Sequence, residues 1–339
     1  MQTRFKPLLT AFFVFCSTII FAQDKEAVLL ADGVTLQKTG KHAEAAAKFK
    51  EILQAQADNA AANYQLAFSL VALKNGSEAI PYAEKATKIN SAYTAAAYSL
   101  LGGIYDASAQ AEKAIAVYNE GLKKFPNDQN MWFNSGLAYF RSKQYAEAEK
   151  AAIEAIKLDV KHANSQRLYA LVAFHQNKRM NALLGLCSFL LADPSSPRAE
   201  EAYTNIQSIL KGGVLKGADT KELSTAEAKE AVILNAGITS VINSPSAQKL
   251  SGVALLEYQL KNIFNFVGQA AAKKADKSFF DNFFVAYFFK LAQSNNTEAL
   301  AQLINKNADG AAYEKWRQAN PTKAAAFDEQ VKNTPKLAN

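Results

Sequence analysis

The sequence predicts an all-helical protein in which helix pairs repeat along the first half of the chain and further helices follow. Alanines recur every 34 or 35 residues, and no stretch of useful length alternates apolar and polar residues as a β-strand does. With 49% hydrophobic and 20% charged residues, the 339-residue chain can bury real cores. The 15 glycines and 8 prolines are too few for a collagen-like or low-complexity chain. The recurring alanines are Ala45, Ala79, Ala114, Ala148 and Ala182.

The first residues have the pattern of an export signal. Arg4 and Lys6 precede an apolar stretch that runs to Phe21, and Ala22 offers a small residue for cleavage before Gln23. We therefore expect residues 1–22 to be a signal peptide and the mature chain to be periplasmic or extracellular, within the cell envelope. A lipid anchor on Cys16 is disfavoured because the apolar stretch continues beyond it.

Charge and cysteine content narrow the classes of partner for the mature chain. The formal net charge is +7 and falls to +5 without residues 1–22, which contain two basic and no acidic residues. Acidic residues interleave with the basic ones, so no nucleic-acid partner is expected. No later segment has the roughly 18 consecutive apolar residues of a membrane helix, so we expect no integral membrane segment in the mature chain. Cys187 is the only cysteine after Cys16, which excludes an intrachain disulfide.

A second set of small residues has the same spacing as the alanines. Its members fall in the other half of each period, and an apolar residue follows each alanine of the first set by four positions. Small side chains are needed where two helices cross closely, and larger ones fill the neighbouring gap. Each period therefore contains two helices. The second set is Gly33, Ala67, Gly102, Gly136 and Ala170, and the following residues are Phe49, Ala83, Tyr118, Ala152 and Leu186.

The pattern resembles the tetratricopeptide repeat family, whose unit is a helix–turn–helix of 34 residues. The third period shows it best, with Leu101-Gly102 and Tyr105 in its first helix, Ala114, Tyr118 and Gly121 in its second, and Pro126 at its end. The fourth period is similar through Trp132, Gly136, Tyr139, Ala148 and Ala155, and Pro194 ends the fifth. The first two periods depart from the pattern. Asp32 precedes Gly33 where the family usually has an aliphatic residue, and Ala57 and Ser91 occupy positions where proline is common.

This resemblance implies an α-solenoid over residues 27–211, made of about five repeats and a capping helix at Arg198–Leu210. Stacked repeats form a right-handed superhelix with a concave inner surface. Turn residues between the paired helices agree with this arrangement, as at Thr39-Gly40-Lys41 and Lys74-Asn75-Gly76.

A glycine-rich linker at residues 212–223 predicts a boundary before a small helical domain at 224–332, with a flexible tail at 333–339. Ser224 and Glu227 fit a capping box that begins a helix ending before Ser244-Pro245. Further helices are expected over 252–272, 278–293, 298–304 and 311–319, with a last one reaching Val331. The helix at 278–293 is so rich in phenylalanine that we expect it at the centre of its domain, with a partner-facing portion as the alternative.

The inner surface is the candidate binding site, because helical spacing places aromatic and cationic side chains there. Such residues form the hot spots of partner-binding grooves. Two alternatives stay open: some of these aromatics are core residues displaced by a one-residue register error, or the C-terminal half or a second copy of the chain covers the surface. The predicted partner-binding residues are Tyr64, Phe68, Phe133, Phe140, Arg141, Arg167, Phe174 and His175.

The sequence has none of the common motifs of catalysis or cofactor binding. The chain has no phosphate-binding loop, dinucleotide fingerprint, serine elbow or zinc-protease motif, and its three histidines are scattered, so no cofactor or metal is expected. Cys187 with His175 is the one candidate nucleophilic pair, but apolar neighbours favour a buried, inert thiol.

The leading hypothesis is therefore an exported, non-catalytic scaffold that binds a protein or peptide in an aromatic, mildly basic groove. Two alternatives are a structural subunit of a cell-envelope assembly, in which the repeats self-associate, and an enzyme whose site lies within residues 220–335.

Overall fold

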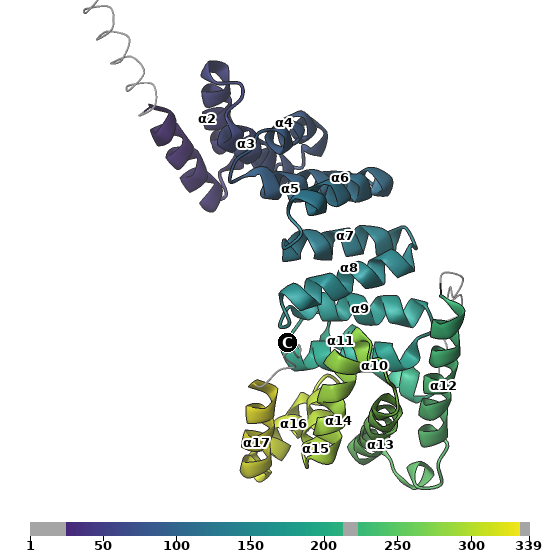
Figure 1. Cartoon of the computed structure of the whole chain (residues 1–339). Coiled ribbons are helices and arrows are strands. Elements are labelled where there is room, and N and C mark those ends of the chain that lie inside the picture. Colours follow the sequence, from purple (N-terminus) through teal and green to yellow (C-terminus); the bar gives the residue numbers. More distant parts are fainter. Residues whose placement is uncertain (1–24, 213–222, 333–339) are drawn as a thin grey trace, which may run out of the picture. The chain divides into compact units, whose positions relative to one another are not determined.

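The structure is a computed structural model that describes residues 25–212 and 223–332. The predicted signal peptide, most of the predicted linker and the predicted tail lie outside these residues. The chain divides into two compact units, Met1–Asn134 and Ser135–Asn339, and each is described by itself (Figure 1). The predicted domain division at 212–223 stays a prediction.

The first unit contains helix pairs in which each helix packs against the next along the chain. The first described helix covers residues 25–38. It is followed by α2 (His42–Ala55), α3 (Ala60–Ala72), α4 (Gly76–Lys88), α5 (Thr94–Ala107), α6 (Ala111–Lys124) and the start of α7 (Gln129–Arg141).

The second unit continues the pairs and adds the C-terminal helices. The remaining repeat helices are α8 (Tyr145–Leu158), α9 (Ala163–His175) and α10 (Arg179–Ala192), followed by α11 (Ala199–Leu210). The later elements are α12 (Thr225–Ile242), η1 (Ala247–Lys249), α13 (Gly252–Ala272), η2 (Asp281–Val285), α14 (Ala286–Gln293), α15 (Thr297–Asn305), α16 (Gly310–Ala319) and α17 (Pro321–Lys332). The prediction of an all-helical chain is confirmed, and the described residues include no strand.

The two sets of small residues lie at close helix crossings, as expected. All five alanines of the first set are 0% exposed. A methyl group added at Gly33 would lie 2.5 Å from the ring of Phe49, and one added at Gly102 would lie 2.4 Å from the ring of Tyr118. Each glycine therefore leaves the space that the aromatic ring of the paired helix occupies, which is why the spacing of the two sets is linked.

The turn inside each helix pair has one repeated backbone conformation. The second residue after the first helix has a positive φ in all five pairs, and the residue that follows it donates a backbone hydrogen bond of 2.8–3.0 Å to the carbonyl five positions earlier. This is the Schellman termination of a helix, which usually employs glycine. Here the left-handed residues are Gly40, Lys74, Ala109, Lys143 and Asn177.

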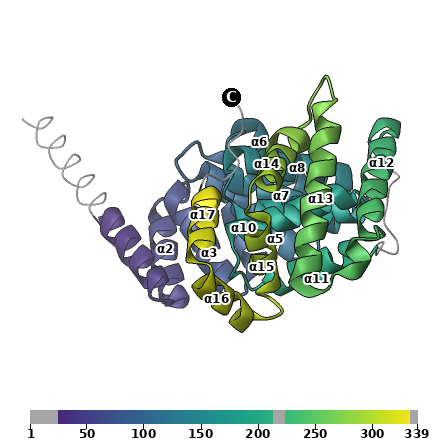
Figure 2. The same ribbon diagram turned by 90° about the horizontal axis from the view of Figure 1, so that it is seen from below.

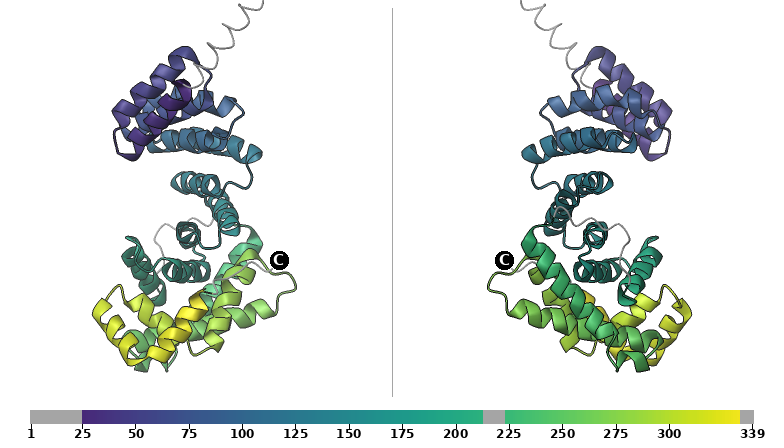
Figure 3. Two further views of the ribbon diagram at one scale, coloured as in Figure 1. Left: turned by 90° about the vertical axis from the view of Figure 1, so that its left-hand side faces the viewer. Right: turned by 90° about the vertical axis from the view of Figure 1, so that its right-hand side faces the viewer.

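The C-terminal helices of the second unit pack against the last repeat. Helices α11, α12 and α15 and the π-helical turn η2 all contact α10, and α13 lies beside α12, α14 and α15 (Figures 2 and 3). Phe283, Phe284 and Phe288 are fully buried, so the prediction that the phenylalanine-rich helix is central is confirmed. The predicted helix over 278–293 forms, but its residues 281–285 widen into the π-turn. None of the described helices is long and apolar enough to cross a bilayer.

Candidate functional site

An exposed apolar face lies on α3 in the first unit. Phe68 is 42% exposed and Val71 is 36% exposed, although both are large apolar side chains. Tyr64, one turn earlier, is half-buried and has its ring 5.5 Å from that of Tyr93. The ring of His42 lies 6.3 Å from Phe68, edge on. Two of the predicted binding residues therefore share one helix face, on which Phe68 is accessible to a partner.

Three aromatic rings come together in the second unit. Phe140 on α7 contacts the ring of His175 at 5.1 Å and that of Tyr145 at 5.8 Å, and Tyr145 stacks on His175 at 5.3 Å. Burial lowers the pKa of His175, because it disfavours the charged imidazolium. The lowered pKa favours the neutral imidazole, which packs among its aromatic neighbours in this cluster, and the role of His175 in binding stays a prediction.

The other predicted binding residues differ in how far their side chains are exposed. Phe133 is half-buried and Arg141 is exposed on α7. Arg167 forms an ion pair with Glu201 of α11, with an Nη2–Oε2 distance of 2.7 Å. Phe174 is 8% exposed, so its ring belongs mainly to the core. The predicted set thus divides between the two units, and its role in binding stays a prediction.

A cavity of about 470 Å³ lies in the second unit, and none of the predicted binding residues lines it. One wall is a face of α8 that includes Glu149 and Ile153, and the opposite wall is the start of α12 with Glu227 and Glu230. The lining also includes Phe279 and Phe280 at the beginning of the phenylalanine-rich helix, together with Tyr169, Gln176, Lys178 and Asn181. Its volume lies in the range of small-ligand sites.

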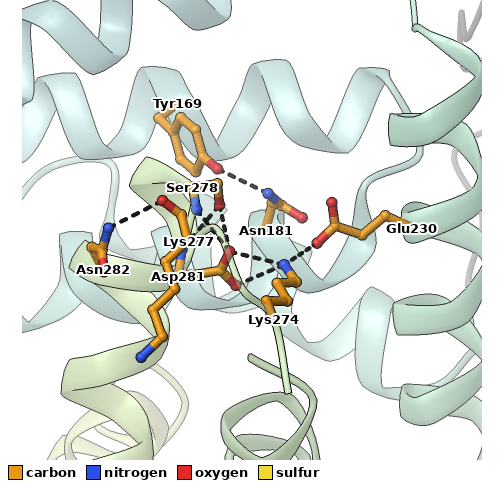
Figure 4. Close-up of polar contacts among 8 residues, drawn as sticks. All are labelled: Tyr169, Asn181, Glu230, Lys274, Lys277, Ser278, Asp281 and Asn282. Atoms are coloured by element: carbon orange, nitrogen blue, oxygen red, sulfur yellow. Dashed lines mark hydrogen bonds and ion pairs between the residues drawn. The ribbon is translucent and has the colours of Figure 1, made fainter. Parts of the chain in front are cut away.

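Two lysines tie the walls of this cavity together. The Nζ atom of Lys178 lies 2.7 Å from Glu149 and 3.1 Å from Glu227, and so joins α8 to α12. Lys274 lies between Glu230 and the buried Asp281, as Figure 4 shows, and its Nζ atom is 2.8 Å from Asp281. The ion pairs of Lys178 therefore bridge the α8 and α12 walls, whereas those of Lys274 connect α12 to the start of η2.

Asp281 also forms part of the N-terminal cap of the phenylalanine-rich helix. Its carboxylate accepts hydrogen bonds from the backbone N–H and the hydroxyl of Ser278, and its own N–H donates to that hydroxyl (Figure 4). This reciprocal cap fixes the helix start and therefore the position of Phe279 and Phe280 at the cavity.

Gln176 is the unusual polar residue of the cavity. Its side chain is 1% exposed, and neither its amide nitrogen nor its amide oxygen has a hydrogen-bond partner among the described residues. Leaving a buried amide unpaired costs free energy, and a water or another molecule in the cavity that completes its bonds is one explanation for such a group. The Nδ2 atom of nearby Asn181, in contrast, donates to the hydroxyl of Tyr169 at 2.9 Å (Figure 4).

The candidate nucleophile of the sequence analysis is inert in this structure. Cys187 is fully buried, and burial raises the pKa of its thiol. A thiol that stays protonated is a poor nucleophile. The prediction of a buried structural cysteine is confirmed.

Sequence reasoning did not find the cavity because its residues come from four separate stretches of chain. Gln176 precedes a turn residue, and such a position is ordinarily solvated. The one local signal was the Ser224–Glu227 capping box, which the structure confirms and which fixes the start of α12. Nothing in the sequence indicated that α12 would lie opposite α8.

Comparison with known proteins identifies the repeats. The family model described as tetratricopeptide repeat matches residues 30–95, 100–159 and 133–197. The search of curated proteins found no match.

Several solved structures are similar to the chain at low identity. A MamA fragment from Desulfovibrio magneticus RS-1 is 18% identical and covers 51% of this chain and 98% of its own, with a TM-score of 0.46. The pilF protein of Pseudomonas aeruginosa is 12% identical, with coverages of 88% and 99% and a TM-score of 0.44. A tetratricopeptide repeat protein from Parabacteroides merdae ATCC 43184 is 14% identical, with coverages of 84% and 100% and a TM-score of 0.47.

The family match covers both helices of each pair. The two sets of small residues and the turns recur at the same positions of each repeat within it. Residues 30–197 therefore contain a tetratricopeptide repeat array of paired helices, which further helices follow.

Proposed function

We propose that this protein is an exported, non-catalytic scaffold that binds a protein or peptide partner through aromatic side chains on the first helices of its repeats. Tetratricopeptide repeats generally mediate protein–protein interaction, and the family match therefore implies a protein partner. The signal-peptide pattern of residues 1–22 supports the proposed export to the cell envelope.

The observation that carries the proposal is the exposed apolar face of α3. Phe68 and Val71 lie about one turn apart and both remain accessible. Burying the part of Phe68 and Val71 that is still exposed would contribute about 1–2 kcal/mol each at roughly 25 cal/mol per Å², and the two together reach the size of an interface hot spot. Charged Arg141 and the Phe140 cluster offer a second contact region of the predicted kind in the other unit.

The proposal is tested with two matched pairs of exposed residues. The variant Phe68→Ser with Val71→Ser removes the apolar face of α3. The control variant Val232→Ser with Ile233→Ser removes an equally apolar exposed pair on α12, where the side chains are 69% and 61% exposed. The tagged chains are incubated with envelope extract from the native host, and captured proteins are identified by mass spectrometry.

We expect a partner that the wild type and the α12 control both capture and that the α3 variant loses. Thermal unfolding should show all three chains folded at the assay temperature, with a lower midpoint for the α3 variant than for the control, because Phe68 and Val71 are more than half buried. Equal capture by the α3 variant and the wild type would contradict the proposal. Large defined oligomers of the purified chain in light scattering would instead favour the structural-subunit hypothesis.

A further inference from the structure

The ion pairs around the α8–α12 cavity leave negative charge in excess. Four carboxylates form ion pairs with only two ammonium groups. Lys178 pairs with Glu149 and Glu227. Lys274 pairs with Glu230 and Asp281. The inner cluster therefore has a formal charge of −2. Glu149, Lys178 and Asp281 are largely buried, so solvent screens this charge only partly.

The remaining charged side chains lie on the more open wall of α8. Lys157 pairs with Glu154 at 2.8 Å, and exposed Lys150 makes no ion pair with the described residues. Counting Lys150, the cavity retains one net negative charge. The pKa of Tyr169 reflects the same field, since burial and then the negative charges of Glu149, Glu230 and Asp281 raise it.

Gln176 provides the second, independent indication of a ligand. Its amide oxygen and nitrogen both lack partners among the described residues, and the residue belongs to the lining of the cavity. The oxygen can accept a hydrogen bond from an ammonium or guanidinium group that the carboxylates also attract.

The apolar part of the lining suits an alkyl chain. Ile153, Phe279 and Phe280 line the cavity together with the charged groups. Lysine and arginine side chains combine such an alkyl stem with a cationic head. A metal ion fits less well, because no group of three or more His, Cys, Asp or Glu side chains converges in a metal-binding arrangement among the described residues.

We propose that this cavity binds a basic side chain of a protein partner, whose cationic head lies among Glu227, Glu230 and the amide of Gln176. The site is distinct from the aromatic residues of the proposed scaffold surface. It gives the protein a second, charge-selective contact, formed where a C-terminal helix faces a repeat helix.

The test uses small probes and the full chain in isothermal titration calorimetry at low salt. The probes are N-acetyl-arginine methylamide, its lysine counterpart and N-acetyl-citrulline methylamide, which has the shape of arginine without its charge. We expect both basic probes to bind at least about tenfold more tightly than the citrulline probe, and 0.5 M salt to reduce the difference. Equal affinities for arginine and citrulline would overturn the proposal. Putrescine supplies the cation without a peptide, and tighter binding of putrescine than of both peptides would overturn the assignment to a protein partner.

Three variants locate the binding site. Glu230→Gln should weaken arginine binding about tenfold, and Lys150→Met should strengthen it severalfold by removing a competing cation. Gln176→Met should weaken binding while raising the thermal midpoint, because it removes an unpaired buried amide. The exposed control Gln269→Met should change neither. Binding that Gln176→Met and Glu230→Gln leave unchanged would refute the site, even if arginine bound elsewhere on the chain.

Discussion

Two adjacent glycines in α5 test whether the small residues exist to admit aromatic rings. A methyl group at Gly102 would lie 2.4, 2.5 and 2.8 Å from three ring atoms of Tyr118, whose side chain is 1% exposed. A methyl group at Gly103 would meet only the Tyr118 hydroxyl, at 3.8 Å. Both variants gain helix propensity, but only Gly102→Ala forces a buried ring to move.

The expected magnitudes follow from these two terms. Replacing glycine by alanine within a helix stabilises by about 0.5–1 kcal/mol, whereas overpacking a core costs about 1–3 kcal/mol. Gly103→Ala should therefore raise the free energy of unfolding by about 0.5–1 kcal/mol, and Gly102→Ala should lower it by up to about 2 kcal/mol. The two variants should differ by about 1–3 kcal/mol.

The assay is urea and thermal unfolding of the full chain, followed by circular dichroism at 222 nm. In a Tyr118→Leu background the cost of Gly102→Ala should shrink, because the ring that it displaces is gone. Equal stabilisation by Gly102→Ala and Gly103→Ala would refute the argument that the repeat spacing reflects close helix crossings.

Three other predictions concern the turns, a histidine and the cysteine. Ala109→Gly should stabilise the chain by about 0.5–1 kcal/mol in urea unfolding, because Ala109 has a φ of 56°, whereas Gly40→Ala should destabilise it at the matching position. Because folding lowers the pKa of His175, the unfolded chain takes up this proton at a higher pH than the folded chain. The stability that neutral His175 contributes is therefore complete above a pH of about 6.5 and is lost as the pH falls through the folded-state pKa. Thermal midpoints should therefore fall less between pH 7 and 5 in His175→Gln than in the wild type, and an identical fall would contradict this assignment. Cys187 should react with a disulfide reagent at a negligible rate in the native chain and rapidly in urea; fast native labelling would show that the thiol is accessible.

The sequence was sufficient for the repeat architecture. Both sets of small residues, the capping box at Ser224 and the helices of the second half could be read locally, since each depends on residues within one or two helical turns or on a fixed period. The left-handed turn position was harder to find. Glycine or asparagine marks it only at Gly40 and Asn177, while Lys74 has a positive φ one residue before the Asn75-Gly76 pair that suggested the turn.

Exposure and pairing of the site residues depended on tertiary structure. The repeat places Val71 and Phe174 at equivalent positions, four residues after Ala67 and Ala170, yet Val71 is 36% exposed and Phe174 is 8% exposed, because burial depends on which neighbouring helix covers each side chain. The cavity around Gln176 has the same origin. Its charged side chains come from helices far apart in sequence. They line one cavity together with the buried amide of Gln176 only after α12 packs opposite α8. A sequence repeat depends only on the spacing of residues along the chain. The electrostatic field and the solvent accessibility at a given residue depend on every segment that folding brings near it.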